Sequence, residues 1–319
     1  MIPTLFVISV VAFMVISLPP GDFVTSYVAN LSSQGESVEA AVIEQMRERY
    51  GLDQPVYIQY LKWMRNILFE GDFGKSFVFR RPVTELIWQR LTLTLVLAFC
   101  TLVFTYSVAL PVGVYSAAKQ YSVGDYVATF LGFIGVAIPQ FLLALVLMYV
   151  AFKYFDQSVI GLFSLEYREA AWSWGKVVDL LKHLWIPVII LGIAGTAMLI
   201  RIMRANLLDE LHKPYVLTAR AKGLSEGKLL FKYPVRVALN AYVSTAQYRV
   251  PEMINASTVI SVVLSLPTTG PLLLEALMQQ DMYLAGAFIL LLSTLTIVGT
   301  LVSDIALAWV DPRIRYREV

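Results

Sequence analysis

Side chains that carry catalysis or bind metals are scarce in this 319-residue sequence, which has one cysteine, Cys100, and two histidines, His183 and His212. One cysteine cannot form a disulfide within the chain, and no metal-binding site or catalytic triad can be assembled around these three residues. We therefore expect no enzyme activity, no bound metal and no cofactor in this chain. His183 is predicted to mark the outer membrane interface and His212 a solvated cytoplasmic loop.

Charge is also scarce, because only 15% of the residues are charged while 58% are hydrophobic and the mean hydropathy is +0.67. This composition excludes an ordinary soluble domain and indicates a membrane protein. A helix that crosses ~30 Å of hydrocarbon needs roughly 20 apolar residues, since its backbone polar groups must pair within the segment. Six stretches meet this requirement: about 2–20, 91–118, 126–152, 184–200, 244–266 and 283–310.

The predicted fold is therefore all-α, a polytopic membrane protein with six transmembrane helices. Its divisions are helix 1 over residues 1–21, an extracytoplasmic segment over 22–90, and a five-helix membrane core over 91–319 that includes a cytoplasmic loop at 201–243. A cleaved signal peptide is the alternative for the first stretch. Because Leu18–Asp22 has no small-x-small cleavage pattern, we interpret this stretch as a membrane anchor.

The density of Lys and Arg predicts the orientation, because positive charge is retained on the cytoplasmic side. Segments 117–126, 201–243 and 311–319 hold 12 Lys and Arg among 62 residues. Segments 22–91 and 153–184 hold 12 among 102 residues. The denser set is placed inside, so both termini are predicted to be cytoplasmic.

The outer segment 22–90 contains helical patterns and one misleading motif. Amphipathic helices are predicted around Val38–Tyr50 and Tyr57–Leu68, as a lid, a docking surface or a brace for the spans. Gly71–Ser76 reads Gly-Asp-Phe-Gly-Lys-Ser, but Phe69 stands where a phosphate-binding loop needs its first glycine. We expect a structural turn there and no ATP binding by this chain.

The cytoplasmic loop carries the clearest local signal, at Thr218–Ser225. Gly223 can take a positive φ at a helix end and act as a pivot, and Ser225 can cap the helix that follows. A compact helix-turn-helix is predicted, whose small residues permit close approach by another protein and whose leucines supply apolar contacts. These residues are Ala219, Ala221, Gly223, Leu224, Leu229, Leu230 and Phe231. The alternative is an amphipathic segment on anionic lipid, since the loop is basic.

With these segments the chain resembles the dipeptide and oligopeptide-type permeases of bacterial ABC importers, the binding-protein-dependent inner-membrane component family. The resemblance covers nearly the whole chain. It rests on Ile2–Leu5, Leu18–Asp22, Tyr50–Pro55, Gly71–Ser76, Tyr215–Leu224 and Asp311–Arg315. The loop and the C-terminal segment are its most specific parts.

This resemblance implies a multi-pass permease subunit of the bacterial plasma membrane that imports a peptide, an oligosaccharide or nickel. Its implied partners are a second permease, two cytoplasmic ATPase subunits that hold ATP and Mg, and an extracytoplasmic solute-binding protein; nucleic acid is not among them. The loop would be the coupling helix-turn-helix that sits in a groove of an ATPase. The implied coupling residues are Thr218, Ala219, Arg220, Ala221, Lys222, Gly223, Leu224 and Ser225.

Polar residues within the predicted third and fifth spans are candidates for the transport pathway. They are Gln140, Asn255, Ser257, Thr258 and Ser261. The alternative for each is a hydrogen bond within its own or a neighbouring helix. Arg249 and Glu252, three residues apart, are interpreted as an ion pair that serves packing.

Two other classes of function compete with an importer. An ion-coupled secondary transporter needs acidic or histidine proton sites at mid-membrane and repeated broken helices, and the sequence shows neither. A membrane scaffold that does not transport would use the loop for docking, but it leaves the long outer segment and the polar fifth span without a purpose.

Overall fold

A computed structural model of the chain describes residues 2–17, 43–45, 54–76, 78–155, 160–279 and 281–310. These residues are almost entirely helical, and their only β feature is an isolated bridge between Lys75 and Pro82. The all-α prediction is confirmed for this part of the chain. The elements are α1 (Ile2–Ser17), α4 (Val56–Arg65), the π-helix η1 (Asn66–Glu70), α5 (Val83–Ala118), α6 (Val123–Ala137), α7 (Gln140–Phe155), α8 (Trp174–Leu211), α9 (Pro214–Ala221), α10 (Glu226–Lys232), α11 (Pro234–Ser244), α12 (Ala246–Val263), α13 (Thr269–Met278) and α14 (Met282–Val310).

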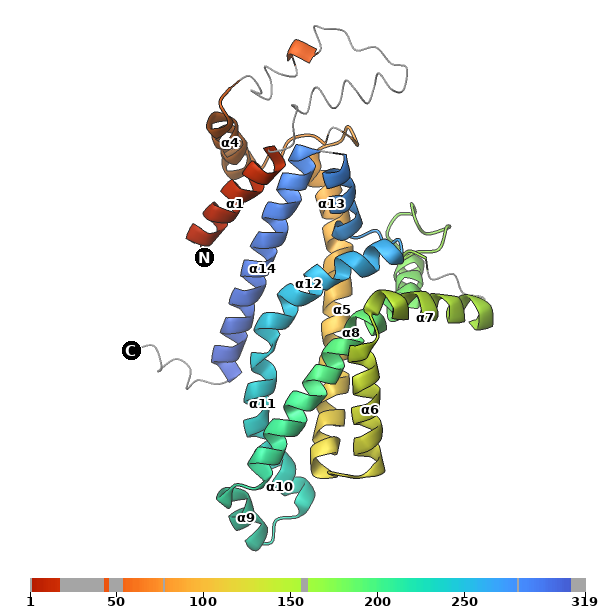
Figure 1. The fold of residues 1–319 in the computed structure, drawn as a ribbon, viewed down its shortest axis with the longest axis vertical. Helices are drawn as coiled ribbons and strands as arrows, with labels where there is room; N and C mark the ends of the chain where they lie inside the picture. The colour runs from red at the N-terminus through yellow and green to blue at the C-terminus, as the bar shows by residue number, and fades with distance from the viewer. Residues whose placement is uncertain are drawn as a thin grey trace. The chain divides into compact units, whose positions relative to one another are not determined.

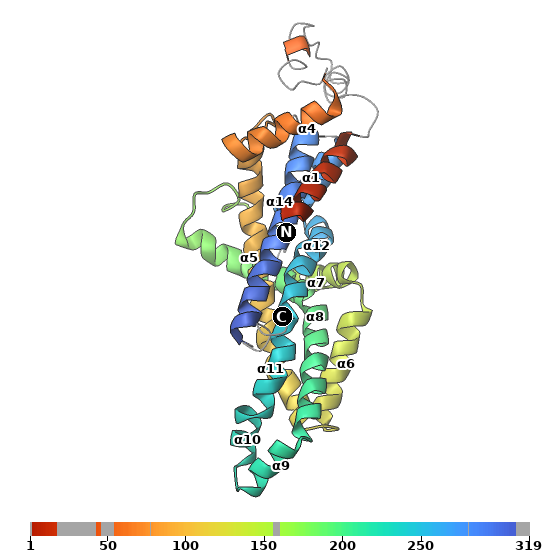
Figure 2. The same ribbon diagram turned by 90° about the vertical axis from the view of Figure 1, so that its left-hand side faces the viewer.

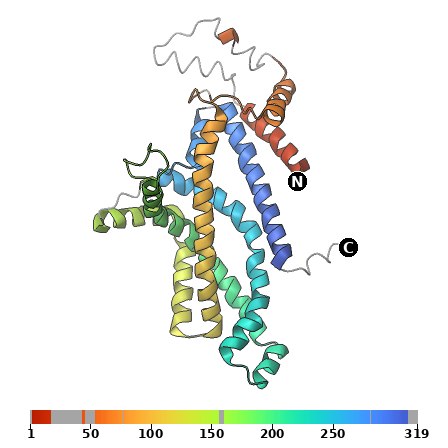
Figure 3. The same ribbon diagram turned by 180° about the vertical axis from the view of Figure 1, so that it is seen from behind.

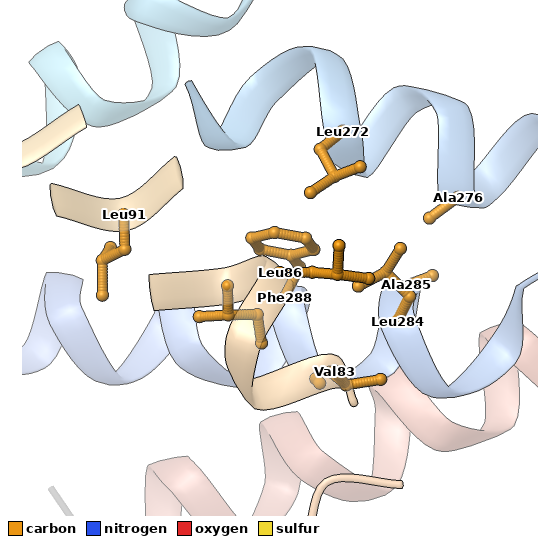
Figure 4. Packing of buried hydrophobic residues seen from close by; sticks show 10 residues of the cluster. Val83, Leu86, Leu91, Leu272, Ala276, Leu284, Ala285 and Phe288 are labelled. Carbon is orange, nitrogen blue, oxygen red and sulfur yellow. The ribbon is translucent and has the colours of Figure 1, made fainter. Parts of the chain in front are cut away.

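The chain divides into two compact units, one over Met1–Leu93 and Thr268–Ile297, the other over Thr94–Pro267 and Val298–Val319. In the first unit, the beginning of α5 packs against α13 and α14 around Phe288 (Figure 4). Val83, Leu86 and Leu284 belong to this fully apolar cluster. The stabilisation from such contacts is non-directional and grows with the apolar area removed from water. The cluster therefore holds the three helices together.

Helix α4 confirms the amphipathic pattern predicted around Tyr57–Leu68, and it packs on α1. The Tyr60 hydroxyl lies 2.7 Å from Ser9 Oγ, and the Phe13 ring lies 5.6 Å from the rings of both Tyr60 and Trp63. These contacts support the interpretation of α4 as a brace for the first predicted span. The other helix, predicted around Val38–Tyr50, lies mostly outside the described residues.

The motif at Gly71–Ser76 is a structural turn, as predicted. Gly71 and Gly74 have φ values of +63° and +87°, and the Gly74 N–H donates to Asp72 Oδ1 at 2.8 Å. Ser76 Oγ donates to Asp281 Oδ2 at 2.5 Å. Positive φ at both glycines explains why this turn needs them.

The second unit is organised around α8, a 38-residue helix that packs against α6 and α11. Helix α11 lies beside the C-terminal half of α8, and α9 and α10 lie beyond their ends (Figure 1). Helix α6 runs along α8 on another side (Figure 2). An added Cβ at Gly135 would lie 3.0 Å from Ile193 of α8, so this glycine permits close contact between the two helices.

The stretch predicted as one membrane-spanning helix within 126–152 is two helices, α6 and α7, bent by 105° at a short break. At the break, Ile138 is extended with φ −81° and ψ 124°, and Pro139 follows it. A residue before proline is disfavoured in the helical region, which explains the position of the break. The prediction was wrong about a continuous helix here; the pair is either a broken span or a re-entrant loop.

Among the described residues, α5, α8 and Tyr283–Val302 of α14 are each long and apolar enough to cross a membrane, and the bent pair adds a fourth if it is one span. The apolar part of α1, Pro3–Met14, is shorter. The predicted count of six therefore stays a prediction. Helix α5 begins at Val83, so the predicted boundary at residue 90 falls within a helix.

Candidate functional site

The predicted helix-turn-helix is present as α9, a glycine turn and α10, which together we call the α9–α10 unit (residues 214–232). Helix α9 starts with Pro214 and ends at Ala221. Gly223 follows with φ +79°; its N–H donates to Arg220 O at 3.0 Å, and the Leu224 N–H donates to Ala219 O at 3.4 Å. This pairing is a Schellman motif, which uses a glycine to end a helix.

The turn is also braced by charge. Arg220 Nε and Nη2 donate to the two carboxylate oxygens of Glu226, at 2.6 and 3.1 Å. This pairing lowers the pKa of Glu226 and raises the pKa of Arg220. Ser225 occupies the N-cap position of α10, but its side chain makes no capping hydrogen bond. The prediction that Ser225 precedes this helix as its N-cap residue is thus confirmed, whereas the hydrogen bond expected from its side chain is not formed.

The α9–α10 unit has a small core of its own. Val216, Ala219 and Leu229 are buried together, with Leu224 and Tyr233 packed against them. Ala219 and Leu229 therefore hold the two helices together, and in this conformation they are not available for the partner contact predicted for them. Six other predicted coupling residues are exposed: Thr218, Arg220, Ala221, Lys222, Gly223 and Ser225.

Two exposed apolar side chains complete the outer surface of the unit. Leu217 is 55% exposed on α9 and Phe231 is 62% exposed on α10. Phe231 was predicted as a contact residue, whereas Leu217 was not singled out. Together with the exposed Lys222, they place apolar and basic groups on the surface of the unit.

Hydrogen bonds and a core cluster hold the α9–α10 unit to the rest of the second unit. The Tyr215 hydroxyl donates to Glu210 Oε2 at 2.5 Å, and burial together with this bond raises the Tyr215 pKa to about 12. Behind the unit, Met203 and Leu207 of α8 pack with Val235 of α11 in a buried cluster that also includes residues of α5. Leu230 of α10 packs against this cluster, so the α9–α10 unit is held to α8 and α11.

The pathway candidates lie on α7 and α12, two helices that pack against each other. Ser257 and Ser261 are buried within this chain, while Thr258 and Gln140 are partly exposed. Among the residues that the structure describes, Ser261 Oγ has no hydrogen-bond partner. The side chain of Asn255 lies outside the described residues. The pathway role of all five stays a prediction.

The remaining singled-out residues have local roles. Arg249 Nη1 donates to Glu252 Oε2 at 2.8 Å, which confirms the ion pair predicted within the fifth stretch. His183 Nδ1 lies 2.8 Å from Asp179 O, and His212 Nδ1 lies 2.7 Å from Leu208 O. Both histidines are thus in contact with a carbonyl oxygen one turn earlier in α8.

The structure also reveals two polar contacts that the sequence pattern did not indicate. Asp125 of α6 pairs with Arg204 of α8 through two hydrogen bonds of 2.9 Å each. Asp281 is fully buried and accepts hydrogen bonds from Ser76 Oγ, from the Val78 N–H and from the Leu284 N–H. Each of these contacts joins segments that are far apart in the chain. The only signal in the sequence is a charged residue beside an apolar stretch, because a charge that becomes buried needs a partner.

Two family models and several known proteins match this sequence. The family model described as binding-protein-dependent transport system inner membrane component matches residues 109–316, and its N-terminal counterpart matches residues 1–98. The oligopeptide transport system permease protein AppB of Bacillus subtilis is 37% identical over 317 residues, which is 99% of this chain and 96% of AppB. The glutathione transport system permease protein GsiC of Escherichia coli K12 is 32% identical over the same shares of the two chains. The chain belongs to the family of inner-membrane permease components of binding-protein-dependent transport systems.

Proposed function

We propose that this chain is one of two permease subunits in an ATP-driven importer of peptides. The α9–α10 unit is the observation that carries the proposal, because an exposed, self-supporting pair of short helices suits docking on a cytoplasmic ATPase. In this arrangement the chain binds no nucleotide itself, and the ATPase subunits hold ATP and Mg. A solute-binding protein delivers the peptide from outside.

Peptides are the favoured solute class because of the relatives. One is named for oligopeptides and the other for glutathione, which is a tripeptide. Neither name supports the oligosaccharide or nickel options. Family membership likewise gives no support to the ion-coupled secondary transporter, which would work without a binding protein.

Coupling requires that nucleotide state and pathway state each change the free energy of the other. A unit that transmits such a change must keep its own shape. The core around Val216 and Leu229, the Schellman turn at Gly223 and the Arg220–Glu226 pair all serve that purpose. Six spans, cytoplasmic termini and a pathway shared with a second permease are further parts of the proposal.

Uptake by the reconstituted transporter tests the function. Proteoliposomes that contain the chain with its co-expressed permease, ATPases and binding protein are given radiolabelled glutathione, penta-alanine or maltotriose, with ATP or without it. We expect ATP-dependent accumulation of at least one of the two peptides and none of maltotriose. Accumulation of maltotriose alone, or peptide uptake that follows an ion gradient without ATP, would contradict the proposal.

The docking surface is tested in the same preparation with Leu217→Glu and Phe231→Glu. Each places a charge on the exposed apolar surface of the α9–α10 unit, so each is expected to reduce the ATPase bound per permease. Leu165→Glu is the matched control, because Leu165 is 84% exposed in the segment predicted to lie outside. If the loop instead lies on anionic lipid, ATPase content stays normal and removal of anionic lipid changes activity.

A further inference from the structure

The contact between Asp125 and Arg204 joins the α5–α6 hairpin to the helix that leads into the α9–α10 unit. Arg204 lies on α8, in the segment that continues without a break to Leu211, and α9 begins at Pro214. Asp125 lies in the first turn of α6, directly after the hairpin turn at residues 119–122. Figure 3 shows the hairpin that α5 and α6 form. The two residues are 79 positions apart in sequence.

Arg204 and Asp125 form a bidentate ion pair. Arg204 Nε donates to Asp125 Oδ1 and Arg204 Nη2 donates to Asp125 Oδ2, each at 2.9 Å. Oδ2 also accepts the Tyr121 N–H at 2.9 Å, and the Asp125 N–H donates to Ser122 Oγ at 3.3 Å. The Asp125 side chain is 3% exposed and that of Arg204 is 27% exposed. Two parallel bonds between planar groups fix orientation as well as distance.

The position of Asp125 in its own helix strengthens the pair. Ser122 is the N-cap of α6, and a carboxylate in the first turn is favoured by the positive end of the helix dipole. Tyr121 has φ +63°, a conformation uncommon for a residue other than glycine, and this turn directs its N–H to the carboxylate. The hairpin turn is thus built to present Asp125 to α8.

Apolar packing alone would leave the hairpin less firmly fixed. The cluster around Met203 and Leu207 also contacts α5, but its apolar contacts are non-directional, whereas two parallel hydrogen bonds between planar groups fix an orientation. The two bonds of the ion pair are lost when α6 rotates or slides relative to α8. The pair therefore fixes one register between the hairpin and the helix that carries the α9–α10 unit.

We propose that Asp125 and Arg204 are a positioning pair for energy coupling, which makes the α5–α6 hairpin move with the α9–α10 unit when nucleotide binds to the ATPases. This inference rests on the proposed function, because it requires an ATPase at the α9–α10 unit. Neither residue contacts nucleotide or solute. The pair acts by keeping α6 and α8 in register.

The motion itself can be measured by the distance between two spin labels in the assembled, reconstituted transporter. Cys100→Ala removes the only native thiol of this chain, and the chain is labelled before it is assembled with its partners. Labels are then placed at Gly227→Cys on α10, where an added side chain meets no atom within 4 Å, and at Val127→Cys on α6, which is 51% exposed. Spectra are recorded without nucleotide and after trapping with ATP and vanadate.

With the pair intact, we expect the same label-to-label distance in both states, because the two elements move together. Asp125→Asn combined with Arg204→Gln removes both charges at once, which avoids a buried unpaired charge. In this double variant the distance distribution is expected to broaden and to differ between the two states. ATP hydrolysis is expected to lose about fivefold or more of its stimulation by the binding protein purified with its own bound solute, the lower end of typical coupling.

Two further variants make the result decisive. Asp209→Asn is the control, because Asp209 is a charged residue that is exposed five positions further along α8, and it should behave as the wild type. Arg204→Lys keeps the positive charge but loses the planar pair of N–H donors. It should therefore lose part of the coupling between ATP hydrolysis and the binding protein. Wild-type distances and stimulation in the double variant, or in Arg204→Lys if the double variant does not assemble, would overturn the inference. Failure of the proposed function is seen separately, as absence of ATPase from the wild-type preparation.

Discussion

Replacing Gly223 with valine is the sharpest test of the turn between α9 and α10. Gly223 has φ +79°, and a Cβ added there meets no atom within 4 Å. The substitution therefore introduces backbone strain without a steric clash. For residues with a side chain, left-handed backbone costs roughly 1–2 kcal/mol, and the cost is greatest for β-branched residues such as valine.

A cost of that size raises the population of the opened turn by roughly 5- to 30-fold. Opening breaks the bonds from Gly223 N–H to Arg220 O and from Leu224 N–H to Ala219 O. We expect the variant to insert and accumulate normally, but to lose hydrogen-exchange protection in α9 and α10 and to uncouple ATP hydrolysis from uptake. Both quantities are measured on the reconstituted transporter.

Gly227→Val is the matched control, since Gly227 lies four residues further on, has equally open surroundings and has no positive φ. It should leave protection and coupling unchanged, because valine is tolerated in an exposed helix at least as well as glycine. Wild-type protection and uptake in Gly223→Val, or an equal loss in both variants, would refute the reasoning from backbone strain.

Three other outcomes follow from the structure. Asp281→Asn weakens the buried contacts to Ser76 and Leu284 and should cost about 1.5–3 kcal/mol, read as a lower thermal midpoint of the purified chain; an unchanged midpoint would contradict this. Gly192→Val brings a Cβ to within 2.6 Å of the Phe104 ring and should destabilise the chain by about 1–3 kcal/mol, whereas Gly132→Ala, with 3.5 Å of room, should not. Tyr215 should ionise near pH 12, measured as the absorbance change lost in Tyr215→Phe. Because burial and the Glu210 contact raise its folded pKa, the contribution of this hydroxyl to stability is present below pH 10 and is lost as pH rises through about 12. Ionisation near pH 10 would show that neither cause acts on the hydroxyl.

Local features of the chain were predictable from sequence because they depend on near neighbours. The helix end at Gly223 and the turn at Gly71–Ser76 follow from glycine's access to positive φ, and the Arg249–Glu252 pair follows from helical spacing. The bend at Ile138 was not predicted, although the sequence contains Pro139. Hydropathy depends only on composition, and the apolar stretch continues across the break.

Long-range partners were not predictable in the same way. Asp125 and Arg204 are 79 residues apart, and Ser76 and Asp281 are 205 apart, so no spacing rule connects them. The burial of Ala219 and Leu229 inside the α9–α10 unit likewise depends on how two short helices fold together. The pathway candidates on α7 and α12 stay a prediction, because the proposed pathway is shared with a second permease, whose residues the sequence of one chain does not contain.

Co-purification tests the central claim most directly. The tagged chain is isolated from native membranes in mild detergent, and the proteins that accompany it are identified by mass spectrometry, beside a parallel preparation of Phe231→Glu. The account predicts a second multi-pass permease and ATPase subunits with the wild-type chain, and the permease with less ATPase for the variant. A wild-type chain that is recovered alone, yet still supports uptake in proteoliposomes, would contradict it.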